Sequence, residues 1–280
     1  MIYSTGNIQI TSTKGTASKA QAIVIEGKNN VKITSSTLKC GGISYNNKND
    51  ECGVLIYQSM SGDSNEGIST FTSTSSTIEI LSTNPSYSIA PMFYITNTET
   101  NIKLTSSTLN FGSNIFMKID EGTWGISGNN GGKAIVTLTC TDVKGNIIVG
   151  HTSTLTLYLF GTNFIGTING ENTAQKIEIF VDKNSTITIT GNSYVTHLTS
   201  QLKNGANLIN GTYTWNDGHN IPPSSIPVPW EDDPVSQIPE FLKKLIDDAL
   251  ATLGVEAARN ICRKYINEEI CKAYLGWDTR

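Results

Sequence analysis

Charge is scarce in this chain and unevenly distributed. Asp, Glu, Lys and Arg together make up 16% of its 280 residues. Residues 1–220 contain 13 Lys, 14 acids and no Arg, which gives a net charge of −1. Nucleic-acid binding requires clustered cations that replace phosphate counterions. The sequence has no such cluster, so nucleic acid is not expected as a partner.

Long apolar runs and paired metal-binding motifs are also missing. No run reaches the length of a membrane-spanning helix, so no membrane span is expected. The five cysteines include no Cys-x-x-Cys pair and the three histidines are scattered, which argues against a zinc site. The Ser/Thr/Asn-rich composition is typical of extracellular or cell-surface proteins, yet no signal peptide is recognisable at the start. We therefore expect a trimmed or internal piece of such a protein.

A short phrase recurs through the first 220 residues: a polar pair followed by alternating apolar and polar residues. Copies occur at 35–40, 75–80 and 106–111, each after an alternating segment. The phrase predicts the end of one strand, a corner and the start of the next strand. The aligned corner residues are Ser12, Ser35, Ser75, Ser106, Cys140, Gly161 and Gly191, at intervals of 23, 40, 31, 34, 21 and 30 residues.

Two all-β folds are compatible with this pattern. An antiparallel sandwich would use hairpin turns such as Asn169-Gly170, Asn204-Gly205 and Asn210-Gly211. A parallel solenoid would use coils of about twenty residues with similar side chains stacked at the corners. The short intervals favour the solenoid. The longer intervals predict excursions from it, at 41–52, 61–70 and 112–132, as the functional surface.

Three segments resemble a known superfamily: 21–27, 40–63 and the Asn-Ser-Thr-Ile-Thr-Ile-Thr run at 184–193. They are similar to right-handed parallel β-helices of the pectate-lyase-like superfamily, and most of all to secreted carbohydrate-binding β-helix proteins of cellulolytic clostridia. The resemblance implies an all-β, right-handed parallel β-helix. It leaves the activity open, because this fold serves lyases, hydrolases and adhesins.

The composition changes after Asn220, and we expect three regions. Residues 1–220 form the parallel β-helix, residues 221–236 a proline-rich linker, and residues 237–280 a tail of two amphipathic helices. The tail would dock on the solenoid end, on a copy of itself or on a partner. Cys262 and Cys271 could form a disulfide only if the helix breaks near Asn267.

Two cysteines flank a Gly/Asn-rich loop. Cys40 and Cys52 could form a disulfide that closes the excursion between them. A reduced pair is the alternative, because spacing alone does not establish the geometry that a disulfide requires.

Calcium is the one metal that the sequence suggests. Asp120, Glu121 and Asp142 could converge if the excursion at 112–124 folds over the neighbouring coil, since carboxylate oxygens are the ligands that Ca²⁺ prefers. The alternative is that these acids are solvated loop residues without a ligand.

Sugar binding requires exposed aromatic faces beside polar groups. Tyr213 and Trp215 point to the same face of an expected strand, and Trp124 lies in a loop between two glycines. These three residues are the predicted carbohydrate-binding residues. For Tyr213 and Trp215, the alternative is that they cap the open end of the core.

Three functions remain. The first is a non-enzymatic carbohydrate-binding or adhesive β-helix whose partner is a polysaccharide or surface glycan. The second is a module of a homo-oligomeric or filamentous assembly, joined through the helical tail or the solenoid ends. The third is a degenerate polysaccharide lyase, which is disfavoured because residues 1–220 lack Arg and show no aspartate cluster. Ice binding by a flat Thr array is also disfavoured, because the excursions should disturb its register.

Overall fold

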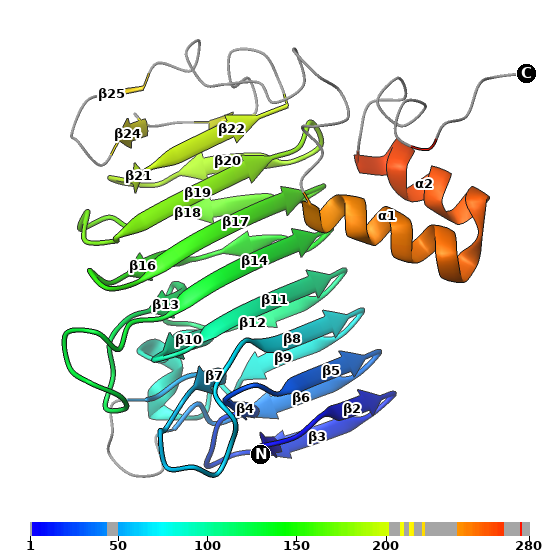
Figure 1. Ribbon diagram of the computed structural model, residues 1–280. Coiled ribbons are helices and arrows are strands. Elements are labelled where there is room, and N and C mark those ends of the chain that lie inside the picture. The colour runs from blue at the N-terminus through cyan, green and yellow to red at the C-terminus, as the bar shows by residue number, and fades with distance from the viewer. Residues whose placement is uncertain are drawn as a thin grey trace, which may run out of the picture.

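The computed structural model describes residues 2–43, 50–201, 208–209, 213–215, 220–221, 240–265 and 275. Of these, residues 208–209, 213–215, 220–221, 240–241 and 252–253 are described for the backbone alone. In this part of the chain the strands form five stacked sheets, and two helices lie beside them (Figure 1). The expected all-β class with a short helical tail is confirmed.

Four of the five sheets are entirely parallel. Sheet A contains β1 (Ile2–Ser4), β4 (Ile23–Glu26), β7 (Val54–Tyr57), β10 (Phe93–Thr96), β13 (Ile115–Ile119) and β16 (Asn146–Val149). Sheet B contains β2 (Ile8–Thr11), β5 (Asn30–Thr34), β8 (Ser69–Thr74), β11 (Glu99–Thr105), β14 (Lys133–Thr139), β17 (Thr154–Phe160), β19 (Lys176–Val181) and β22 (His197–Ser200). Sheet C contains β3 (Lys14–Ala17), β6 (Thr37–Cys40), β9 (Thr77–Ile80) and β12 (Thr108–Asn110).

Sheets D and E complete the set within the described residues. Sheet D contains β15 (Val143–Lys144), β18 (Asn163–Gly166), β20 (Thr186–Ile189) and β23 (Leu208–Ile209). Sheet E contains β21 (Tyr194–Val195), β24 (Tyr213–Trp215) and β25 (Asn220–Ile221), and β24 pairs antiparallel with β25. The antiparallel sandwich that the Asn-Gly pairs could have formed is not the fold.

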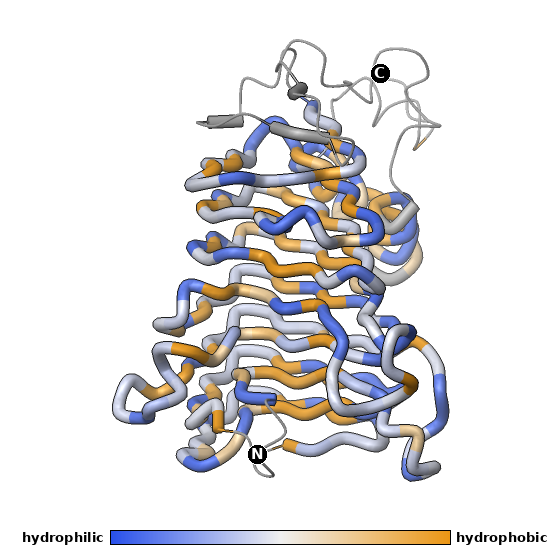
Figure 2. The backbone as a smooth tube through the Cα atoms, turned by 90° about the vertical axis from the view of Figure 1, so that its left-hand side faces the viewer, coloured by the Kyte–Doolittle hydropathy of each residue, from blue (hydrophilic) through white to orange (hydrophobic). Residues whose placement is uncertain are grey.

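The chain visits the sheets in a repeating order. It runs through a strand of sheet A, one of sheet B and one of sheet C, and then returns to sheet A beside the previous strand. From β15 onward, sheet D takes the place of sheet C. Sheet A ends at β16, so β18 is followed directly by β19 of sheet B, and β21 of sheet E follows β20. We call one such circuit a pass. Hydrophobic segments recur in the same places from pass to pass (Figure 2).

The core lies between the sheets and follows from the period-two alternation. In β8, residues alternate between buried and half-buried positions along the whole strand. Phe71, Phe93 and Phe116 are fully buried, and the ring centroids of neighbouring members of this trio are 5.9 and 5.7 Å apart. Burying each such side chain contributes about 1.5–3 kcal/mol. Stacking similar residues from successive passes therefore builds one continuous core.

The corner between sheets B and C or D has left-handed backbone geometry, with φ between 48° and 54° at six of the seven aligned positions: Ser12, Ser35, Ser75, Ser106, Cys140 and Gly161. The hydroxyl that follows each of these residues binds the backbone of its own pass, as in Thr141 Oγ1 to Thr139 O at 3.1 Å. Four of these six hydroxyls also accept an N–H from the neighbouring pass, as Thr141 Oγ1 does from Ser107 at 3.1 Å. The same bond joins Thr13 to Ser36, Ser36 to Ser76, Thr141 to Thr162, and Thr162 to Ser185. The expected stacking of hydroxyls at the corners is confirmed.

Gly191 is wrongly aligned with these corners. The Thr162 N–H binds Ser185 Oγ, 23 residues further along, so Ser185 has the next hydroxyl of the series and Asn184 takes the aligned corner position. Gly191 follows β20, near a different corner. The segment at 185–189, Ser-Thr-Ile-Thr-Ile, matches the repeated phrase and could have identified the corner from the sequence.

The excursions leave the strand register of sheet B intact. Thr11, Thr34, Thr74, Thr105 and Thr139 are paired one above another across five strands. The expectation that excursions disturb such an array is wrong, because they emerge at corners and between other strands. Lys32 and Lys103 in the adjoining column still interrupt a flat threonine surface.

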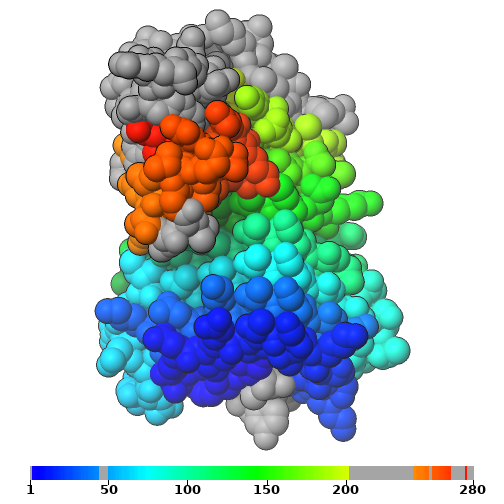
Figure 3. Space-filling model, turned by 90° about the vertical axis from the view of Figure 1, so that its right-hand side faces the viewer, coloured from blue at the N-terminus to red at the C-terminus, as the bar shows by residue number. Residues whose placement is uncertain are grey.

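The tail docks on the side of the stack. Helices α1 (Glu240–Leu253) and α2 (Val255–Tyr265) meet at Gly254, whose φ is 85°. Leu242, Ile246, Ala249, Ala258, Cys262 and Tyr265 form an apolar cluster with Phe160 of β17. The helices cover part of one face and leave the N-terminal strands open on that side (Figure 3). Of the three docking sites expected for the tail, the end of the stack is not the one observed, because the apolar site that accepts the helices lies on a sheet face.

Three smaller expectations concern the tail and its linker. Cys262 is disulfide-bonded, and α2 is described as far as Tyr265, while Asn267 and Cys271 lie outside the described residues. Strand β25 crosses the expected boundary at 220/221, and residues 222–236 lie outside the described part of the chain. Neither described helix has the length and apolar character needed to cross a membrane.

Candidate functional site

A surface groove lies between sheet C and sheet D, whose facing strands are not hydrogen-bonded to each other. Strand β12 is the last strand of sheet C and β15 is the first of sheet D. The groove between them has a volume of about 780 Å³, within the usual range for ligand pockets. Its described lining comprises Tyr87, Leu109, Asn110, Phe111, Asn114, Asp142, Val143, Lys144, Asn163, Ile165, Thr186 and Thr188.

Two half-buried aromatic rings form part of the groove, and each lies against a glycine. Tyr87 belongs to a short 3₁₀ helix (Pro85–Ser88), and a side chain at Gly112 would overlap its ring. Phe111 follows β12, and a Cβ at Gly145 would lie 3.0 Å from its Cζ. Both rings also pack against the main core. The glycines therefore allow two flat apolar surfaces to remain at the groove.

Polar groups form the rest of the wall. Asp142 Oδ1 accepts the Asn163 N–H at 2.8 Å, and Thr186 Oγ1 donates to Asn163 Oδ1 at 2.7 Å. These bonds run across neighbouring strands and orient the Asn163 amide. Lys144 adds a cation and Asn110 an exposed amide. The groove therefore offers hydrogen-bond donors and acceptors beside aromatic surface.

The groove extends toward the hydroxyl-lined corner. An adjoining hollow of about 520 Å³ shares Leu109, Asp142 and Asn163 with it. That hollow also reaches Ser107 and Gly161, members of the corner series. The combined surface crosses several passes and could accommodate an elongated polar ligand.

Trp124, a predicted sugar-binding residue, is not part of this groove. It is half-buried and packs on Tyr57, with ring centroids 4.3 Å apart and an interplanar angle of 43°. Its loop folds over the outer face of sheet A, where it covers Val24, Leu55 and Tyr94. The expectation of an exposed indole failed because the flanking glycines let the loop turn back onto the sheet.

The other two predicted sugar-binding residues lie in β24. The strand pairs with β21 and β25, as the expected strand at this position requires. The side chains of Tyr213 and Trp215 lie outside the described part of the structure. Neither the sugar-binding nor the end-capping interpretation is therefore tested.

The proposed calcium ligands do not converge. Asp120 and Glu121 precede β14, whereas Asp142 follows it, so the seven-residue strand separates them. Glu121 instead contacts His151 Nε2 at 3.0 Å, accepts from Thr152 Oγ1 at 3.1 Å, and accepts the Gly128 N–H at 3.3 Å. Among the described residues, no group of three His, Cys, Asp or Glu side chains could hold a metal ion.

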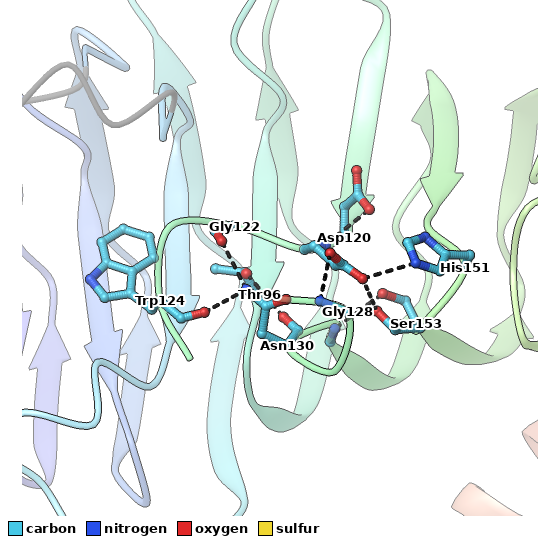
Figure 4. A network of polar contacts seen from close by, with 11 residues as sticks. Thr96, Asp120, Gly122, Trp124, Gly128, Asn130, His151 and Ser153 are labelled. Atoms are coloured by element: carbon cyan, nitrogen blue, oxygen red, sulfur yellow. Dashed lines mark hydrogen bonds and ion pairs between the residues drawn. The ribbon is translucent and has the colours of Figure 1, made fainter. Parts of the chain in front are cut away.

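The loop that carries Asp120 and Glu121 is held by its own polar contacts (Figure 4). Asn130 Nδ2 donates to the carbonyls of Gly122 and Trp124 at 2.8 and 2.6 Å. In the same view His151 lies on one side of this network and the Trp124 ring on the other. Through its contacts with His151 and Thr152, Glu121 anchors this loop to the following pass.

Cys40 and Cys52 are free thiols, so the suggested disulfide is not formed. The two side chains belong to different apolar clusters. Cys40 packs in the main core, and Cys52 packs on the outer face of sheet A with Tyr57 and Tyr94. Burial raises the pKa of Cys40 to about 11 and raises that of Cys52 well above its usual value. Both thiols are therefore protonated and unreactive at neutral pH.

The sequence interpretation missed most of the groove. Asp142 was singled out for a different role, while Tyr87, Phe111, Lys144 and Asn163 were not. The 31-residue interval between Ser75 and Ser106 was a usable signal, because its surplus contains Pro85 and Tyr87. The break between sheets C and D had no sequence signal.

Comparisons with known proteins leave the chain without an identified relative. No protein-family model matches it, and no curated protein or solved structure matches it either.

Proposed function

We propose that this protein binds a polysaccharide or surface glycan without modifying it. The observation that carries the proposal is the groove between sheets C and D, where Tyr87 and Phe111 lie beside amide, hydroxyl, carboxylate and ammonium groups. Sugar rings have apolar C–H faces that pack on aromatic rings, and hydroxyls that bind polar side chains. The groove has both kinds of surface.

The lining of the groove argues for binding over hydrolysis. Glycoside hydrolases typically use a pair of carboxyl groups on either side of the scissile bond. Asp142 is the one carboxylate among the described lining residues, and it accepts the Asn163 N–H. A single carboxylate already engaged in the wall suits an orienting role.

The fold that best fits the repeated passes is a right-handed parallel β-helix. The order of sheets, the parallel pairing and the stacked corner hydroxyls support it. Relationship to the pectate-lyase-like superfamily is part of the same proposal and is based on the sequence resemblance. Determining the hand of the passes in an experimental structure would test it.

An extracellular or cell-surface location is the second part of the proposal. The composition supports it, as does the disulfide at Cys262, because disulfides persist mainly in oxidising compartments. Finding the protein in a reducing cytoplasm would contradict this part alone.

Glycan binding can be tested on arrays followed by calorimetry. Phe111→Leu keeps an apolar side chain and removes the flat ring, so it should weaken binding about three- to tenfold. Gly112→Ala should displace the Tyr87 ring and have a similar effect. Phe180→Leu, at a half-buried aromatic position in sheet B, is the matched control and should bind normally. The proposal would be rejected if the protein bound no glycan on the array, or if the groove variants bound as tightly as the wild type.

Assembly through the end of the stack is a second candidate, with one observation in its favour. Each of β1, β2 and β3 pairs with a strand on one side alone among the described residues. Free strand edges can pair with other chains. Light scattering tests this candidate, and a monomer at high concentration would reject it.

A further inference from the structure

A second concave surface lies at the corner where the chain passes from sheet A to sheet B. Two excursions emerge there, 58–68 between β7 and β8 and 120–132 between β13 and β14. The pass between them turns the same corner through Asn97 and Thr98 alone. The three segments and Glu99 surround a cleft of about 370 Å³. We call this the corner cleft, and it is separate from the groove between sheets C and D.

The corner cleft is preformed, because its two walls are tied together. The Asn97 N–H donates to Asn130 O at 2.8 Å, and Asn97 Nδ2 donates to Gln58 O at 2.7 Å. Asn97 therefore links both excursions, one through its backbone N–H and the other through its side chain. The packing of Trp124 on Tyr57 also holds the second excursion against the sheet. A ligand would meet walls that need little reorganisation.

Exposed aliphatic side chains stand at the mouth of the cleft. Met60 is 55% exposed and Ile126 is 78% exposed, one from each excursion. An adjoining hollow of about 270 Å³ shares Glu99 and adds Ile68 and Ile135, which are 50% and 46% exposed. Gathered exposed apolar side chains mark interaction surfaces. Flexible aliphatic groups suit the side chains of another protein better than they suit sugar rings, which favour aromatic surfaces.

The charge of the two excursions has one sign. They contain Asp63, Glu66, Asp120 and Glu121 and no Lys or Arg. Glu66 and Glu99 line the cleft. Lys133 pairs with Glu99 at 2.7 Å, whereas Glu66 makes no ion pair within the described residues. The cleft is therefore complementary to a positive charge.

We propose that the corner cleft binds a protein segment that carries Lys or Arg between apolar side chains. The apolar side chains contact Met60 and Ile126, and the cation faces Glu66. This partner class is distinct from the glycan proposed for the groove, so either site can fail without affecting the other.

The test uses three labelled decapeptides and measures binding by fluorescence anisotropy at physiological salt. The probes alternate Lys with Leu, alternate Glu with Leu, or contain Lys alone. We expect the Lys-Leu peptide to bind at least tenfold more tightly than the other two. If the all-Lys peptide binds as tightly as the Lys-Leu peptide, the binding is unspecific charge attraction. If the Glu-Leu peptide binds as tightly, the binding is unspecific hydrophobic contact. Either result, or no binding of the Lys-Leu peptide, overturns the proposal.

Variants on opposite walls locate the binding. Glu66→Gln should weaken the Lys-Leu peptide about three- to fivefold, as expected for one partly exposed charge pair. Ile126→Ser should weaken it about tenfold through lost apolar contact. The controls are Glu171→Gln and Ile89→Ser, at exposed positions outside the cleft, and they should bind normally. Unchanged affinity in both cleft variants, with folding confirmed by circular dichroism, would overturn the proposal.

Discussion

The ring of Phe160 in β17 meets the ring of Tyr265 in α2 edge to face, with centroids 5.5 Å apart and an interplanar angle of 73°. Phe160 is the last residue of β17, and it is paired with Thr139, the last residue of β14. Phe160, on an otherwise polar column, thus forms the docking site for the tail together with Tyr158 of the same strand. Gln201 and Asn184 add hydrogen bonds to the backbone of α2 at Tyr265 and Lys264, both at 3.3 Å.

Phe160→Ala should loosen the tail and leave the sheets folded. Truncating a buried Phe costs about 3–5 kcal/mol, and here the loss falls on the contact with α1 and α2. Hydrogen exchange should speed up in residues 242–265 and remain slow in the sheets. Phe111→Ala is the control, since it is half-buried elsewhere and should leave tail exchange unchanged. Uniformly faster exchange would show that the tail and sheets unfold together.

Thr141→Val should destabilise the stack through the corner series. Thr141 is fully buried, and its hydroxyl serves both Thr139 O and the Ser107 N–H. Valine has nearly the same shape but leaves the buried Ser107 N–H without its bond, at a cost of about 1–3 kcal/mol, whereas Thr139 O still accepts the Ser106 N–H at 2.9 Å. Chemical denaturation measures the change. Thr70→Val, at a half-buried position in β8, should be nearly neutral, and equal losses at both positions would contradict the corner explanation.

Ser75 tests the backbone geometry of the same corner. Its φ is 48° and its side chain is exposed, so substitution changes few contacts. Ser75→Val should destabilise by about 1–2 kcal/mol, because a branched side chain is strained in this conformation, whereas Ser75→Gly should be close to neutral. Gly161 already occupies the equivalent corner two passes beyond Ser106. Similar unfolding midpoints for the two variants would contradict a left-handed corner.

Thiol labelling should distinguish three of the five cysteines. Cys140 is exposed, while Cys40 and Cys52 are free, fully buried and have raised pKa values. A maleimide should modify Cys140 in the native protein, and Cys40 and Cys52 after unfolding. Peptide mass spectrometry identifies the sites. Recovery of a linked Cys40–Cys52 peptide from unreduced protein would overturn the assignment of free thiols.

Alkaline pH should destabilise the covered face of sheet A. Burial is the main cause that raises the pKa of Tyr94 from 10 to about 12. The folded protein retains this proton longer than the unfolded chain does, so the contribution is complete below pH 10 and is lost as the pH rises toward 12. The loss is on the order of 2 kcal/mol.

Tyr94→Phe isolates this effect. It removes the hydrogen bond to Glu121 O at 2.9 Å and should cost about 1 kcal/mol at neutral pH. Between pH 10 and 12 its unfolding free energy should fall less steeply than that of the wild type. Parallel curves for the two proteins would show that Tyr94 does not titrate in this range.

The sequence predicted the repeating parts of the fold because they are governed by near neighbours. Alternation along β11 predicted which side chains face the core, and the repeated phrase located the six corners that have left-handed backbone geometry. Gly191 was misplaced because a glycine resembled the corner at Gly161, while Ser185 carried the repeated phrase. The two helices and their junction at Gly254 followed equally from local periodicity.

The sites depended on contacts between distant segments, which no local pattern reports. Asp142 was separated from Glu121 by the length of β14, and Trp124 was turned onto Tyr57 by its loop. Phe111 and Tyr87 came together because Gly145 and Gly112 leave room for their rings. By itself, then, the sequence determined the strands, the corners and the tail helices, because these depend on periodicity and backbone conformation. Only the tertiary structure decided where the groove, the corner cleft and the tail docking site lie, because each is formed by separate passes packed side by side.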